Sequence, residues 1–191
     1  MLSFPAVHTL AGCLLATNAD ADVLGWGRPA TLLLIHDRPL HAGCPAKLRA
    51  MRSVEFPLHP DGLLTEPAGL PALLHRLATG LDHPLSAAMP YRATLDTIIG
   101  LIRDTAPDAR LLAWAALYDD ILTVAGGPRQ ARRIDAVDTD GRVYQLTHLC
   151  GEDHPLLAVD ETPAAANTPA TGPGLAALLA GTARLTGRTL P

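Results

Sequence analysis

The pair Asp140-Gly141 separates two segments that are rich in β-branched and apolar residues, and it constrains the fold more than any other feature. A two-residue loop would mix polar and apolar side chains on each face of the resulting hairpin. A three-residue loop that ends on a left-handed Gly141 matches like with like. It forms the pairs Val137–Val143, Ala136–Tyr144, Asp135–Gln145, Ile134–Leu146 and Asp138–Arg142. We therefore predict an antiparallel hairpin over residues 132–149, with strands at about 130–138 and 142–149.

Four further segments predict the remaining strands of a sheet. Residues 30–36 are almost entirely apolar, which is typical of a buried central strand. Residues 111–124 carry apolar side chains at both odd and even positions, as a strand covered on both faces does. Residues 53–58 and 156–160 complete the set, and Pro57 favours a sheet edge or a strand end.

Two amphipathic helices are predicted between these strands, at residues 70–80 and 91–105. The first carries one leucine stripe and the second a stripe of leucine and isoleucine, so both are expected to pack on the sheet. Gly80 and Pro107 are expected to end them.

Two segments are less sharply defined by their pattern. Ala6–Thr17 fits a helix or a strand, and a turn is expected at residues 18–22. Pro45 can occupy the first position of a short helix that continues through Arg52.

These elements predict an α+β domain over residues 1–160, with a mostly antiparallel sheet of five or six strands and helices packed on it. A three-layer α/β fold is the alternative, because strands and helices alternate around residues 53–118. Residues 161–174 contain three prolines and no aromatic residue, which predicts a flexible linker.

A short amphipathic helix is predicted at residues 175–187, beyond this linker. About a dozen residues is marginal for an isolated helix in water. We therefore expect it to dock on its own domain or on a partner chain. Its apolar stripe is the predicted partner-binding surface: Leu175, Leu178, Leu179 and Leu185.

Composition limits the class of protein. The chain has 191 residues, of which 48% are hydrophobic, enough to bury a core. The three cysteines form no disulfide pattern and predict reduced thiols in the cytoplasm. Residues 1–19 carry no charge, so they lack the basic start of a secretory signal, and no segment fits a transmembrane helix. Lysine occurs once among the 15 basic residues, a bias that favours a bacterial source.

Histidine and cysteine cluster in two short segments, and imidazole and thiolate are zinc ligands. One cluster is His36, His41 and Cys44, and the other is His148, Cys150 and His154. Neither contains a paired CxxC or an HExxH motif. We predict no cofactor, and zinc is the one that the sequence admits. A small metal-dependent or Cys/His enzyme is accordingly an alternative function.

Basic residues concentrate in residues 26–56, whereas residues 104–162 are acidic. The basic set could follow a phosphate backbone, and on a short helix Arg49 and Arg52 would share a face. The net charge of −4 nevertheless argues against strong nucleic-acid binding by the whole protein. A nucleic-acid accessory protein is the second alternative, through Arg28, Arg38, Lys47, Arg49 and Arg52.

Nucleophile and phosphate-binding signatures are missing from the sequence. The three serines lie outside any GxSxG motif, and no Walker-type loop is present. The leading hypothesis is therefore a non-enzymatic protein-interaction or regulatory module, with a partner protein or a second copy of the chain as its ligand.

Overall fold

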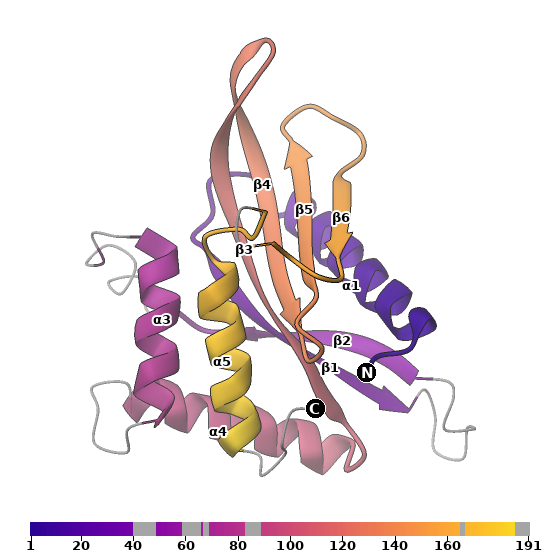
Figure 1. The fold of residues 1–191 in the computed structure, drawn as a ribbon, viewed down its shortest axis with the longest axis vertical. Helices are drawn as coiled ribbons and strands as arrows, with labels where there is room; N and C mark the ends of the chain where they lie inside the picture. The colour runs from indigo at the N-terminus through magenta and orange to yellow at the C-terminus, as the bar shows by residue number, and fades with distance from the viewer. Residues whose placement is uncertain (40–48, 59–65, 67–68, 83–88, 165–166, 186–191) are drawn as a thin grey trace.

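The computed structural model describes residues 1–39, 49–58, 66, 69–82, 89–164 and 167–185. Within them, six strands form one open sheet in the order β2-β1-β3-β4-β5-β6 (Figure 1). Every neighbouring pair is antiparallel, so the α+β prediction is confirmed, and the α/β alternative is wrong because it requires parallel strands. The strands are β1 (Thr31–Pro39), β2 (Arg49–Phe56), β3 (Arg110–Val124), β4 (Gly127–Asp138), β5 (Val143–Leu149) and β6 (Leu156–Asp160).

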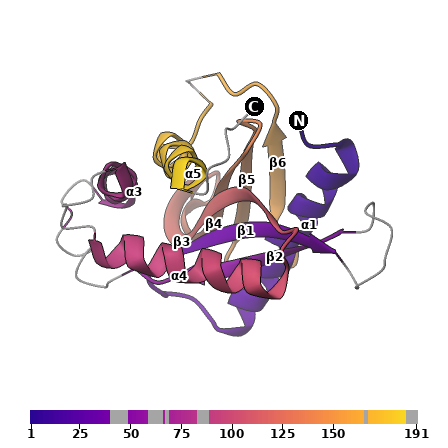
Figure 2. The same ribbon diagram turned by 90° about the horizontal axis from the view of Figure 1, so that it is seen from below.

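Helices cover both faces of this sheet (Figure 2). Of the described helices, α1 lies by itself on one face, which we call the α1 face, and α3, α4 and α5 lie on the other, which we call the three-helix face. The described helices are α1 (Phe4–Val23), α3 (Gly69–Asp82), α4 (Met89–Thr105) and α5 (Gly172–Leu185). None of them is long and apolar enough to cross a membrane.

Alternation along the strands divides the apolar side chains between two cores. On β1, Leu32 and Leu34 join Trp114 in the core of the three-helix face. Leu33 and Ile35 point the other way and pack with the buried Leu10 and Leu14 of α1. The central strands therefore carry apolar side chains at both odd and even positions, because both faces of the sheet are covered.

The β4–β5 hairpin has the predicted register. Val137 pairs with Val143 and Ile134 with Leu146. Gly141 has a φ of 82°, and its N–H donates to the carbonyl of Asp138 at 2.9 Å. The three-residue loop is confirmed.

The predicted turn at residues 18–22 is wrong, because α1 runs through it to Val23. Leu10, Leu14, Asn18 and Ala21 recur at helical spacing and are all buried on one face of the helix. Asn18 keeps the helix on the sheet, since its Nδ2 lies 3.1 Å from His148 Nδ1. Tertiary packing thus overrides the local turn preference of asparagine and aspartate.

The predicted helix through Arg52 is also wrong for its described residues, since β2 begins at Arg49; residues 40–48 lie outside the described part of the chain. β1 continues to Pro39, further than predicted, and β2 supplies the partner for its edge. At this end Arg49 donates two hydrogen bonds to Asp37, at 2.7 and 2.8 Å. The ladder and this ion pair favour the strand over a helix.

The C-terminal helix docks on its own domain through close contacts. The indole N–H of Trp114 donates to Thr182 Oγ1 at 3.0 Å. A Cβ added at Gly174 would lie 2.6 Å from Leu74 Cβ, so only glycine lets α5 approach α3 here. The segment before α5 also contacts the sheet, because Thr171 Oγ1 donates to Asp135 at 2.6 Å and Gln145 Nε2 donates to the Asn167 carbonyl at 3.0 Å.

Candidate functional site

A groove of about 480 Å³ lies between the end of the β1–β2 hairpin and α4, on the three-helix face. Arg52 pairs with His36 across the two strands, and Arg38 follows His36 by two residues, so the three side chains share one face. We call this the His36 groove. Its lining residues are His36, Arg38, Arg52, Val54, Ile98, Leu101, Ile102 and Thr105.

His36 is the buried polar group of the groove, at 6% exposure. Its Nδ1 has no hydrogen-bond partner among the described residues. Burial lowers the pKa of the imidazole, and the charges of Arg38 and Arg52 lower it further, while the backbone and the charge of Asp37 oppose them. The surroundings of His36 therefore favour the neutral ring, whose Nδ1 is enclosed and has no partner among the described residues.

Arg38 and Arg52 supply positive charge to the groove. No carboxylate of the described chain lies within ion-pair distance of either guanidinium. The opposite wall is apolar, and Leu101 on α4 is 60% exposed. The groove thus joins two available cations to an open apolar wall.

The other side of the same strands holds a paired cluster. Asp37 accepts hydrogen bonds from both Arg49 and Arg110, close to the first turn of α1. Burial raises the pKa of Asp37, but the hydrogen bonds from the two arginines outweigh it and hold the pKa below its usual value. Arg49 also donates to the Asp108 carbonyl at 2.6 Å. These arginines bind the protein itself.

The basic residues predicted as a nucleic-acid surface do not share one face. Arg49 and Arg52 are three residues apart on a strand, which places them on opposite sides of the sheet, whereas a helix would have aligned them. Arg28 is exposed in the segment before β1, and Lys47 lies outside the described residues. Arg38 and Arg52 are the two that the fold brings together.

The two predicted His/Cys clusters are not joined through their described members. His148 is on the α1 face, where its Nδ1 contacts Asn18 and its Nε2 lies 2.8 Å from the Glu152 carbonyl oxygen. Cys150 and His154 are exposed, and His41 and Cys44 lie outside the described residues. No group of three or more potential metal ligands occurs within the described ranges. The zinc prediction gains no support there.

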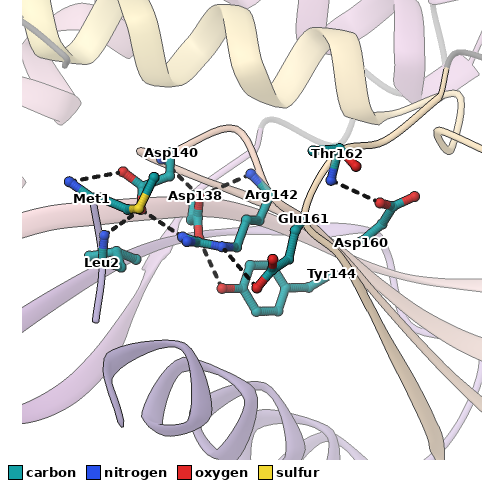
Figure 3. A network of polar contacts seen from close by, with 9 residues as sticks. All are labelled: Met1, Leu2, Asp138, Asp140, Arg142, Tyr144, Asp160, Glu161 and Thr162. Atoms are coloured by element: carbon teal, nitrogen blue, oxygen red, sulfur yellow. Dashed lines mark hydrogen bonds and ion pairs between the residues drawn. The ribbon is translucent and has the colours of Figure 1, made fainter. Parts of the chain in front are cut away.

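The aspartates of the β4–β5 turn have structural roles (Figure 3). Asp138 accepts the N–H groups of Asp140 and Arg142 at 2.8 and 3.0 Å, and the Tyr144 hydroxyl at 2.9 Å. Arg142 bridges Asp138 and Asp140. Burial and the Asp138 charge raise the pKa of Tyr144. Asp135 lies on the other face, where it accepts the Tyr118 hydroxyl at 2.7 Å.

The β3–β4 arm, residues 118–130, projects beyond the rest of the sheet (Figure 1). β1 pairs with β3 only as far as Leu117, and β5 pairs with β4 only from Ala131. Ile121 on this arm is 71% exposed. It lies beside a hollow of about 620 Å³ lined by Asp119, Asp120, Ile121, Pro128, Arg129 and Gln130.

The leucines predicted to bind a partner lie mostly in the protein's own core. Leu175, Leu178 and Leu179 are buried among the residues of α3 and β3. The side chain of Leu185 lies outside the described residues. A partner could reach the three buried leucines only if α5 left the sheet.

The apolar wall of the His36 groove was missed by the sequence reasoning. Leu101 was the available signal, since it is an exposed apolar residue that falls outside the leucine and isoleucine stripe of α4. The approach of α4 to β1 and β2 is a long-range contact that no local pattern shows.

No protein-family model, curated protein or solved structure matches this chain.

Proposed function

We propose that this protein is a non-enzymatic interaction module that binds another protein chain through its β3–β4 arm. The observation that carries the proposal is the exposure of Ile121 on a ribbon that extends past both neighbouring strands. Two-stranded ribbons are marginally stable alone in water. A partner chain that covered Ile121 would remove this apolar surface from water and support the ribbon.

The base of the arm is braced, which supports a rigid binding element. Asp119 accepts the N–H of Gly27 at 2.5 Å and lies 3.4 Å from Arg132 Nε. Arg129 forms an ion pair with Glu152 at 2.9 Å. A braced ribbon loses little conformational freedom on binding.

The edge of the arm favours side-chain contact over strand addition. Asp120 Oδ1 accepts the N–H of Ile121 at 2.8 Å, so a carboxylate occupies the open edge of β3. Charged groups at an edge oppose pairing with a further strand. We therefore expect the partner to offer an apolar socket for Ile121.

A photo-reactive amino acid at position 121, introduced in the cells that make the protein, tests the proposal. We expect one cross-linked adduct of defined mass, lost when the probe is moved to Val23, which is 88% exposed at the end of α1. An adduct of twice the chain mass identifies a second copy as the partner. The proposal fails when neither position gives an adduct or both give the same ones.

A further inference from the structure

The His36 groove has the size and the mixed chemistry of a small-molecule site. Its volume of about 480 Å³ falls within the rough range of 300–1,000 Å³ for ligand pockets. Such pockets combine an apolar lining with a few convergent polar groups. Here the apolar side chains come from α4 and Val54, and the polar groups come from His36 and the two arginines.

We propose that the His36 groove binds a small amphipathic carboxylate, whose head contacts Arg38, Arg52 and His36 and whose apolar body lies along α4. This ligand is independent of the protein partner of the β3–β4 arm, which lies at the other end of β3. The two binding functions therefore fail or succeed separately.

Charge complementarity selects an anion. Arg38 and Arg52 lack carboxylate partners in the described chain, whereas Arg49 and Arg110 on the reverse side share Asp37. Guanidinium groups bind carboxylates through parallel charge-assisted hydrogen bonds. A carboxylate in the groove would supply the counter-ion that the chain provides elsewhere with its own aspartate.

The buried imidazole supplies the second observation that points to a ligand. His36 is 6% exposed, and its Nδ1 has no partner among the described residues. Leaving a buried polar atom unpaired costs free energy. Nδ1 is enclosed in the free protein, so the ring must turn before it can donate to a carboxylate oxygen, and that contact would remove the cost when the ligand is bound.

The apolar wall selects a ligand with a hydrocarbon body. Ile98 and Ile102 line the groove together with Leu101, which exposes 60% of its surface. Burying this surface favours binding, because apolar area is removed from water. A bare inorganic anion would leave the wall in water.

Titration of the full chain with octanoate, followed by calorimetry and by NMR of the histidine rings, tests this proposal. We expect saturable binding and a shift of the His36 ring signals. Arg38→Gln and Arg52→Gln should each weaken octanoate binding about tenfold or more. Arg28→Gln is the matched control, because Arg28 is exposed and outside the groove, and it should leave the affinity unchanged.

Octanol serves as the neutral probe and should bind at least about tenfold more weakly than octanoate. Binding of octanol as tight as that of octanoate would overturn the role of the arginines. Equal affinities of the Arg52→Gln and Arg28→Gln proteins, or a titration that never saturates, would overturn the site.

Discussion

His36 and His148 are equally buried, at 6% exposure, but they lie on opposite faces of the sheet and differ in their partners. On the α1 face, both ring nitrogens of His148 contact polar atoms, of Asn18 and Glu152. On the three-helix face, His36 keeps Nδ1 without a partner in the described chain. Burial alone therefore does not separate a structural histidine from a binding one; the pairing of its nitrogens does.

The same contrast extends to the charged groups of the two faces. On the α1 face, the buried Arg132 and Asp138 are both paired with opposite charges. On the three-helix face, Asp135 is likewise paired with Arg133, but Arg38 and Arg52 in the His36 groove have no carboxylate within ion-pair distance in the described chain. We infer that the paired charged groups contribute to stability, whereas the His36 groove keeps its two arginines for a ligand.

Asp138→Ala should have the largest effect on stability, because it removes the acceptor shared by Arg142 and Tyr144 in the interior of the α1 face. Breaking a buried ion pair costs about 3–5 kcal/mol. Unfolding in urea measures the loss, and Asp153→Ala, at an exposed residue, should change stability by less than about 0.5 kcal/mol. A loss for Asp138→Ala as small as the loss for Asp153→Ala would show that the turn network contributes nothing to the free energy of unfolding.

Gly174→Ala should come next, with a loss of about 2–3 kcal/mol, because the new methyl group would meet Leu74 at 2.6 Å. Gly12→Ala is the matched helical control on α1. A Cβ there meets nothing within 4 Å, so this variant should gain up to about 1 kcal/mol. Thermal unfolding measures both, and a stable Gly174→Ala protein would contradict the close docking of α5.

Replacing each histidine by leucine compares the two faces directly. His148→Leu leaves Asn18 Nδ2 and the Glu152 carbonyl without their partner and should cost about 1–2 kcal/mol. His36→Leu removes a ring nitrogen that has no partner in the described chain, so it should be neutral or stabilising. Equal losses measured in urea would remove the distinction between the two residues.

Lowering the pH should reduce the stabilisation that His36 and Asp37 contribute on the two faces, but in different pH ranges. The pKa of His36 is lowered, mainly by burial, so the unfolded chain binds its proton more readily and stability falls as pH drops below 6.5. The pKa of Asp37 is also lowered, since the hydrogen bonds from Arg110 and Arg49 outweigh the effect of burial. Its contribution is lost only as pH drops below 3.8.

Stability measured from pH 7 to pH 3 checks this prediction. His36→Gln should flatten the curve just below pH 6.5, and Asp37→Asn should flatten the part below pH 3.8. His154→Gln is the control, because that side chain is exposed. A slope near pH 6 that survives in the His36→Gln protein would contradict the assignment.

Local chemistry made parts of the fold predictable from the sequence. The register of the β4–β5 hairpin follows from Gly141 and from the matching of nearby side chains, so the prediction was correct residue by residue. The continuation of α1 and the start of β2 depend on distant partners. Asn18 needs His148, 130 residues away, and Arg49 needs Asp37, which is 12 residues away but reaches it only once β1 and β2 have paired.

The candidate site was predictable only in part. His36, Arg38 and Arg52 were all selected from the sequence, although for zinc and for nucleic acid. Their common face requires β2 to be a strand in register with β1. The wall formed by α4 requires a helix from a different part of the chain. Residue type therefore identified the charged half of the groove, and tertiary structure supplied the apolar half.

The position of β1 beside β3 has a consequence for the order of folding. Leu33 pairs with Ala115, about 80 residues away, whereas the pairs of the β4–β5 hairpin are separated by only 6 to 18 residues. Closing the longer loop costs more entropy. We expect β3, β4 and β5 to assemble before β1 and β2 join them. Substitutions in the β4–β5 hairpin should then slow folding, and those in β1 should mainly accelerate unfolding.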